Sequence, residues 1–300
     1  PRKPVYGRIG YDNSEGGFSM SMRGIDISHW QDGINLFIVP CDFVIIKATQ
    51  GTKFVDPCCN KFYQTAKEAG RKLGVYHFAD GLSSGTAEAD HFIKNVKGYI
   101  GEAILVLDWE ADALKKGVSY AKEFLDRVYE VTGVRPLIYM SKSVCREYNW
   151  TEVVNGNYGL WMAQYANKKP TGYQDKPWSD NRGLGAFKSY AIHQYTSNGH
   201  IDGYNGSLDL DIAYMTPTAW DKYAKANPTF TKTKPILRRG CRGEAVKELQ
   251  ERLNYLGYSC GVVDGIFGDD TKDAVKAYQA DHGLQVDGVV GSKTWDKLII

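Results

Sequence analysis

Short apolar runs alternate with longer amphipathic stretches along residues 23–225. The runs are rich in β-branched and aromatic residues, as buried strands are, and several stretches between them place apolar residues at helical spacing. We expect helices over residues 57–69, 87–96 and 118–131. The expected strands cover residues 24–28, 43–47, 74–78, 104–109, 136–140, 159–163, 190–195 and 208–212.

This alternation predicts an α/β fold with a parallel sheet, because a helix is the usual crossover between parallel strands. Eight strands within residues 23–225 favour a (β/α)8-like barrel. The connections over residues 140–220 are rich in Gly and Tyr and poor in helical periodicity. We therefore expect a barrel that is partly irregular in its second half.

Two segments flank this predicted barrel without strand or helix patterns. Residues 1–22 are polar and Gly-rich and form an N-terminal extension to which no chemistry is assigned. Residues 226–235 are rich in Pro, Thr and Lys and predict a linker. We expect the barrel domain to span residues 23–225 and a second domain to span residues 236–300.

The second domain is predicted to be a small all-α domain of three helices. Apolar residues recur at helical spacing over residues 245–256, and a further helix is expected over residues 271–282. Two similar turns, Asp-Gly-Ile-Phe-Gly at 264–268 and Asp-Gly-Val-Val-Gly at 287–291, are each followed by a Thr. We expect Thr271 and Thr294 to lie at helix N-caps.

Composition and charge exclude several classes of function. The formal net charge of +2 is too small to indicate binding to nucleic acid. No apolar run reaches the ~18 residues that a spanning helix needs, and residues 1–25 lack the apolar core of a signal peptide. We therefore expect neither a nucleic-acid partner nor membrane insertion, and the oligomeric state stays open.

The six cysteines do not predict a metal site. None forms a C-x-x-C pair, and the chain has no H-E-x-x-H motif, so we expect no metal and no cofactor. Cys241 and Cys260 lie in the small second domain and could form a disulfide there. The other four are expected to be mainly buried thiols.

Acidic residues gather at the predicted ends of the strands, where a parallel barrel builds its active site. Asp108 and Glu110 lie two apart after a buried run, so both side chains point to one face. Two close carboxyl groups in a partly dry site raise one pKa, as glycoside hydrolysis requires. Asp26 ends another strand, and its alternative is an Asx-type cap on the following turn. Asp209 and Asp211 lie on the last strand, and a cap or a salt bridge is the alternative for them.

Other polar and aromatic side chains occur at the same rim. His77 and His193 are either acid–base groups or packed, hydrogen-bonded histidines, and the second is more common. Gly81-Leu82-Ser83-Ser84-Gly85 matches the G-x-S-x-G nucleophile elbow of serine hydrolases. That elbow requires a strand to run directly into the Ser, whereas Ala79 and Asp80 intervene here, so a Gly/Ser loop is the favoured interpretation.

Several segments in order resemble glycoside hydrolase family 25, the lysozymes of the N-acetylmuramidase type. They are RGIDISHWQ at 23–31, DFVIIKATQG at 42–51, GVYHFA at 74–79, LVLDWE at 105–110 and the segment 193–211. The tail, with its Asp-Gly-Ile-Phe-Gly turn, resembles the peptidoglycan-binding type 1 domain, a small three-helix fold. One departure is visible, since the family commonly has Trp where His193 stands.

The resemblance implies roles for the rim residues. Glu110 corresponds to the general acid/base, and Asp108 to the partner that orients the substrate's own acetamido group as nucleophile. Asp26 and Asp209 correspond to the other acids of the site. The positions that line the sugar groove correspond to Tyr76, Tyr139, Trp161 and Gln194.

The sequence therefore predicts a peptidoglycan hydrolase that cleaves the bond between N-acetylmuramic acid and N-acetylglucosamine and acts at the cell wall, after secretion or after release from the cytoplasm. Two alternatives stay open for the barrel. One is a wall-binding protein without catalysis, and the other is a serine esterase that uses Ser83. For the tail, the alternative to wall binding is a structural cap on the barrel.

Overall fold

The computed structural model describes residues 21–226 and 234–298. The chain divides into two compact units, with the boundary between Phe230 and Thr231. Residues 1–20 of the predicted extension and residues 227–233 of the predicted linker lie outside the described residues. The first strand begins at Met22.

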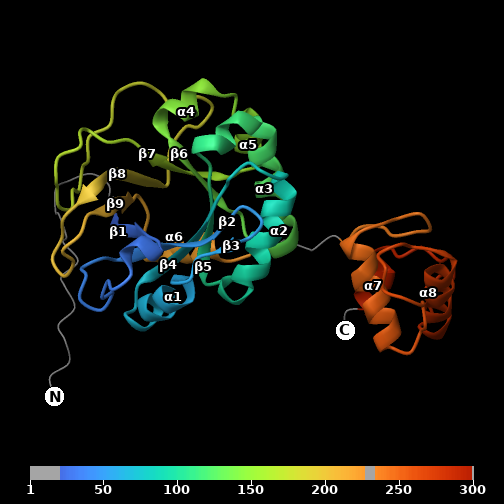
Figure 1. Ribbon diagram of the computed structural model, residues 1–300. Coiled ribbons are helices and arrows are strands. Elements are labelled where there is room, and N and C mark those ends of the chain that lie inside the picture. The colour runs from blue at the N-terminus through green and yellow to red at the C-terminus, as the bar shows by residue number, and fades with distance from the viewer. Residues whose placement is uncertain (1–20, 227–233, 299–300) are drawn as a thin grey trace, which may run out of the picture. The chain divides into compact units, whose positions relative to one another are not determined.

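Eight strands of the first unit close into the predicted barrel (Figure 1). Neighbouring strands follow the order β1, β9, β8, β7, β6, β5, β4 and β2, and β2 pairs with β1 to complete the ring. A short strand, β3 (Phe54–Val55), is added antiparallel to the end of β2. The barrel strands are β1 (Met22–Ile27), β2 (Phe43–Gln50), β4 (Lys72–Phe78), β5 (Ala103–Asp108), β6 (Leu137–Ser141), β7 (Gly159–Ala163), β8 (Ile192–Gly199) and β9 (Leu208–Ala213).

The predicted all-parallel sheet is wrong at its last strand. β9 runs antiparallel to both of its neighbours, β8 and β1, whereas the other barrel pairings are parallel. Only residues 200–207 connect β8 to β9, which is too short for a helical crossover but long enough for a hairpin. The first residues of β9 therefore lie at the same rim as the last residues of the other strands.

The predicted helices of the first half cover the outside of the barrel (Figure 1). They are α1 (Cys59–Glu68), α2 (Gly85–Val96) and α3 (Gly117–Thr132), whose buried residues recur at helical spacing. The later connections are irregular, as predicted: α4 (Lys142–Glu147) and α5 (Thr151–Asn155) are short, and residues 164–191 contain no helix. Across the described ranges, every helix is too short or too polar to cross a bilayer.

Apolar packing closes one end of the barrel interior. Along β2, Val44 and Ile46 pack against the outer helices, whereas Phe43 and Ile45 point into the barrel. The helix α6 (Pro217–Ala224) places Trp220 against Phe43. The Trp220 indole N–H donates to the backbone oxygen of Leu73 on β4 at 2.9 Å. The polar side chains of the barrel interior lie at the opposite end, where the strands β2, β4 and β5 finish.

The second unit has its own hydrophobic core and three helices, as predicted. They are α7 (Glu244–Tyr255), α8 (Asp269–Asp281) and α9 (Ser292–Leu298), and their buried residues include Leu249, Val275 and Trp295. The two Asp-Gly turns are held alike, because Gln250 and Gln279 each bond to a turn aspartate and to backbone groups of the turn.

One expectation for this unit is wrong, and one question that the sequence left open, the state of two cysteines, is answered. Thr271 and Thr294 are not N-caps; they lie inside α8 and α9, are buried, and accept bonds from Gln250 and Gln279. Burial explains this, since each Thr completes the hydrogen bonds of a buried amide. Cys241 and Cys260 are free thiols rather than a disulfide.

Candidate active site

A cavity of about 330 Å³ opens at the rim where β2, β4 and β5 finish. All eight residues that the sequence predicts as catalytic or sugar-binding line this one cavity. They are Asp26, Asp108, Glu110, Asp209, Tyr76, Tyr139, Trp161 and Gln194. They come from seven different strands and one loop, so only the closed barrel brings them together.

Asp108 and Glu110 both face the cavity because the chain stays extended between them. Glu110 has φ −149° and ψ −170°, and the intervening Trp109 points the other way, into the helical layer. There the Trp109 ring packs edge-on against Trp150, with 5.0 Å between the ring centroids. Ala111 then turns the chain with φ +50°, a left-handed conformation that is uncommon for a residue with a Cβ. A buried anchor therefore fixes the separation of the two carboxyl groups.

Asp26 and Asp209 face each other across an antiparallel strand pair. Their Cα atoms are register partners between β1 and β9. Directly opposed residues in such a pair lie close enough for their side chains to interact. The reversal of β9 explains why Asp209 reaches the rim from the start of its strand.

Burial raises the pKa of every one of these acids. Asp26 and Asp108 are nearly inaccessible, and the desolvation of each carboxyl raises its pKa well above the usual value. Desolvation also raises the pKa of Glu110, which is half-buried, and that of Asp209 to about 8. Neighbouring carboxylates add to the effect on Asp26, Asp108 and Asp209. Asp209 therefore retains at neutral pH a proton that an exposed carboxylate would lose.

Lys47 is a lining residue that the sequence reasoning did not select. Its ammonium group lies over the rings of Phe54 and Phe78 and donates to Gln50 at 2.8 Å. Its positive charge lowers the pKa of Asp108 and of Glu110, against the larger effect of burial. The signal was present in the sequence, since Lys47 is a charge within the apolar run of β2.

Gln194 lines the cavity, but its amide is bonded to protein groups. Its Oε1 accepts from the hydroxyls of Tyr139 at 2.8 Å and Tyr165 at 2.5 Å. Its Nε2 must therefore face Asp26, to which it donates at 2.6 Å. The geometry favours a role in holding Asp26, whereas the sequence suggested contact with the sugar.

The two histidines and Ser83 lie apart from this chemistry. His77 is fully buried and bonds to Thr49 and Glu88, and His193 is fully buried and bonds to the backbone oxygen of Gln164. Ser83 bonds to Glu88 and to a backbone oxygen in the loop before α2, with no histidine as its partner. This arrangement lacks the base that a nucleophilic serine needs.

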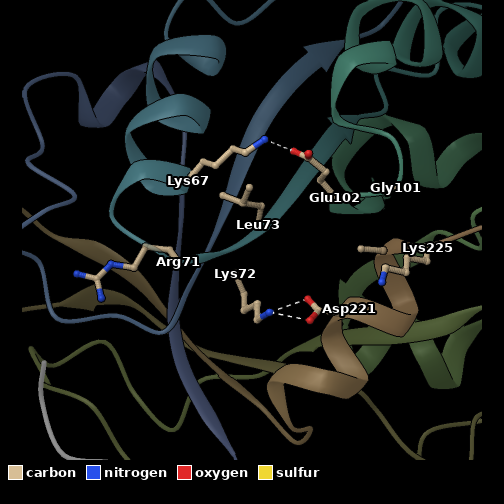
Figure 2. A pocket seen from close by; sticks show the side chains of 9 residues that line it. Lys67, Arg71, Lys72, Leu73, Gly101, Glu102, Asp221 and Lys225 are labelled. Carbon is tan, nitrogen blue, oxygen red and sulfur yellow. Dashed lines mark hydrogen bonds and ion pairs between the residues drawn. The ribbon is translucent and has the colours of Figure 1, made fainter.

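A second cavity, of about 240 Å³, lies at the opposite end of the barrel, before β4 and β5 begin (Figure 2). Both of its acids are paired with lysines: Lys67 pairs with Glu102 at 2.6 Å, and Lys72 pairs with Asp221 at 2.7 Å. Because its acids are paired with lysines, it offers no proton donor comparable to Glu110. The carboxylate-lined cavity is therefore the candidate active site.

The substitution Asp209→Asn is expected to stabilise the fold increasingly between pH 4 and pH 8. The folded Asp209 carboxyl has a pKa of about 8, against about 3.9 in an unfolded chain, so folding retains a proton that the unfolded chain releases. For this group, stability therefore falls as the pH rises between these values and is constant above them. Asparagine does not titrate, so the difference in Tm between variant and wild type should grow across this range and then level off.

Thermal unfolding followed by circular dichroism in a pH series measures this difference. Asp202→Asn, at an exposed position of the β8–β9 connection, is the matched control. A Tm difference for Asp209→Asn that does not change with pH would contradict the prediction.

Comparisons with known proteins agree on both units. The sequence model of the glycosyl hydrolases family 25 matches residues 25–204, and that of a peptidoglycan binding domain matches residues 242–298. The chain is 28% identical over 287 residues to an autolytic lysozyme of Clostridium acetobutylicum, and the aligned region covers 91% of this chain and 77% of that protein. It is 33% identical over 161 residues to the N,O-diacetylmuramidase of a Chalaropsis species, which covers 47% and 74% respectively. A solved bacterial lysozyme from Streptomyces coelicolor has a TM-score of 0.55 and 26% identity, over 69% of this chain and 98% of that one.

Proposed function

Because the chain belongs to the glycosyl hydrolases family 25, we propose that it cleaves the β-1,4 bond between N-acetylmuramic acid and N-acetylglucosamine in peptidoglycan. It is a lysozyme-type enzyme, like the relatives and structures that it resembles. The observation that carries the bond and residue assignment is the meeting of Asp108, Glu110, Asp26 and Asp209 in one cavity.

Glu110 is the proposed general acid and base. It is half-buried, and desolvation raises the pKa of its carboxyl, so a fraction of the enzyme carries the proton that the leaving oxygen needs. The proximity of Lys47 limits this rise. The same carboxylate can then take a proton from the water that completes hydrolysis.

Asp108 is the proposed partner of the substrate's acetamido group. Its Oδ1 has no hydrogen-bond donor among the described residues, and the residue lines the cavity. An acetamido N–H would supply the missing donor and would be oriented by it. A carboxylate at this place also stabilises the positive charge that develops on the sugar and on the acetamido group.

The reaction then proceeds in two balanced steps. The acetamido oxygen attacks C1 as the C1–O4 bond breaks, and Glu110 gives its proton to the leaving O4. The resulting cyclic oxazolinium is opened by water, which adds to C1 while Glu110 recovers a proton. This is a substrate-assisted form of retaining glycoside hydrolysis.

Mass spectrometry of the fragments released from purified peptidoglycan tests this proposal. Reducing-end N-acetylmuramic acid is the expected product. Reducing-end N-acetylglucosamine would overturn the bond assignment while preserving the carboxylate chemistry. Walls that are bound but not cleaved would instead favour a binding protein without catalysis.

We propose that the second unit anchors the enzyme to the wall, which places the protein at the cell wall as its site of action. A family model of peptidoglycan binding covers almost all of this unit, and the unit has a core of its own. A tethered hydrolase benefits because the tether raises the local concentration of glycan strands near the active site.

A chain that ends at Asn227 is therefore expected to sediment with purified walls roughly tenfold less than the full chain. It should keep its circular dichroism spectrum for the barrel and its turnover of short soluble glycans. Residues 231–300 alone should sediment with walls. A truncated chain that binds walls as well as the full chain would instead identify the second unit as a structural cap.

A further inference from the structure

We infer that Asp26 and Asp211 form a carboxyl–carboxylate pair that holds one shared proton, with Asp211 as a positioning residue for Asp26. The inference deepens the proposed function, because it concerns the acid layer beneath the same active site. Asp211 is not among the residues that line the cavity. It therefore has no expected contact with substrate and must act through Asp26.

The strand geometry places Asp211 directly below the acids of the rim. Along β9, Asp209 and Asp211 point to the barrel interior, while Leu208, Leu210 and Ile212 pack into the outer core. Asp26 is the register partner of Asp209, so Asp211 lies one step deeper and diagonal to Asp26. Each of the carboxyl groups of Asp26 and Asp211 also shifts the pKa of the other, which places them close enough to act on one another.

Neighbouring side chains donate hydrogen bonds to two of the four oxygen atoms of the pair. The Oδ1 of Asp211 accepts from the Trp161 indole N–H at 2.9 Å, and the Oδ2 of Asp26 accepts from the Gln194 amide at 2.6 Å. The Oδ2 of Asp211 is buried and has no donor among the described residues. If both groups were ionised, two acceptors would meet here without a proton between them.

Charge and burial lead to the same conclusion. Asp211 is fully buried and Asp26 is 7% exposed, so two full negative charges in contact would be strongly unfavourable. One retained proton satisfies the orphan oxygen and reduces the charge of the pair to that of a single carboxylate. Such a pair titrates as a unit, with its apparent pKa values belonging to both groups.

Other ionisable groups surround the pair from each neighbouring element. On the cavity side the positive charge of Lys47 opposes the acids, and on the other side Asp211 is near Tyr173 and Tyr195. The groups that face Asp26 from the cavity are Asp108 at the end of β5, Glu110 after it, Asp209 on β9, Tyr76 on β4, Tyr139 on β6 and Tyr165 after β7.

The inference gives Asp211 a defined role in the site. A shared proton locks the Asp26 carboxyl in one orientation between Gln194 and Asp211. The pair then presents one negative charge, rather than two, beneath the cationic transition state and beside the proton on Glu110. The site can therefore contain several carboxyl groups close together while carrying fewer negative charges than carboxyl groups.

Infrared spectroscopy of the unliganded protein at neutral pH tests this without reference to turnover. Asp211→Asn removes one carboxyl group together with the shared proton, so the pair keeps a single negative charge and the neighbouring acids experience the same charge. Asp211→Asn, Asp26→Asn and the double variant are each expected to lose the same absorbance, that of one protonated carboxyl. Asp32→Asn, an exposed carboxylate paired with Lys61, should lose none.

The other outcomes of this experiment overturn the inference. No loss in any variant would mean that both carboxyl groups are ionised. A double variant that loses twice the signal of either single variant would mean that each group holds its own proton. Because the signal is read on the resting protein, these outcomes are independent of whether the proposed reaction is correct.

A comparison of two variants at Asp211 tests the positioning role. Asparagine keeps a donor toward Asp26 and an acceptor for Trp161, so Asp211→Asn should keep kcat/KM within about threefold of wild type. Leucine has a similar size but neither group, so Asp211→Leu should lower kcat/KM by roughly tenfold or more. Equal losses in the two variants, at equal Tm, would contradict a role for Asp211 in holding Asp26.

Discussion

Glu110→Gln is expected to lower kcat by roughly 10²–10⁴-fold on peptidoglycan while the protein stays folded. Glutamine has nearly the same shape but carries no proton that it can give to the leaving oxygen. Because Glu110 is half-buried and its pKa is raised mainly by desolvation, removing its charge should not weaken the fold. Dye release from labelled walls measures the rate, and Tm confirms folding.

A matched Glu→Gln exchange separates the chemistry from a general effect of lost charge. Glu102 lies at the opposite end of the barrel, where it pairs with Lys67, and Glu102→Gln should turn over walls at the wild-type rate. Wild-type turnover by Glu110→Gln would remove Glu110 from the mechanism.

Asp108→Asn is the second substitution with a large expected effect, a loss of roughly 10²–10³-fold in kcat. The variant removes the negative charge that stabilises the oxazolinium-like transition state. It also replaces an acceptor by a group that can present N–H to the substrate's own N–H. The Oδ1 of Asp108, which has no donor within residues 21–226 and 234–298, is the atom whose loss matters most in this interpretation.

The nature of the leaving group should distinguish the two acidic residues. A glycan with an aryl leaving group needs little protonation, so Glu110→Gln should recover much of its rate in bond cleavage on that substrate. Asp108→Asn should not recover, because its defect concerns the sugar rather than the leaving oxygen. Equal behaviour of both variants on the aryl substrate would contradict the assignment of separate roles.

The barrel and the acids of its rim could be predicted from local sequence because each strand carries its own signal. The run Ala103–Asp108 is apolar up to its last residue, and the acids follow where the strand ends. Alternation then places Asp108 and Glu110 on one face with Trp109 on the other. These features depend on residues that are neighbours in the sequence, so the spacing of apolar and polar residues predicts them.

The features that were missed depend on contacts between distant strands. The direction of β9 is set by the β8–β9 connection, which is short enough for a hairpin. The apolar run of β9 itself carries no information about the direction of the strand. The role of Gln194 depends on two tyrosine hydroxyls that take up its carbonyl oxygen. Likewise, a helix cap or salt bridge was the sequence alternative for Asp211, and only its burial beneath Asp26 shows its partners.

The hairpin that joins β8 to β9 also bears on how the enzyme could diversify. Asp209 takes its position from pairing with Asp26 on β1, so its location is independent of how long the chain between Gly199 and Leu208 is. In a barrel closed by a helical crossover, an insertion there would have to be repacked against the outer layer. Here residues can be added or removed between the two strands while Asp26 and Asp209 keep their register. We therefore expect variation in the length of this hairpin to change which peptidoglycan variants the enzyme accepts.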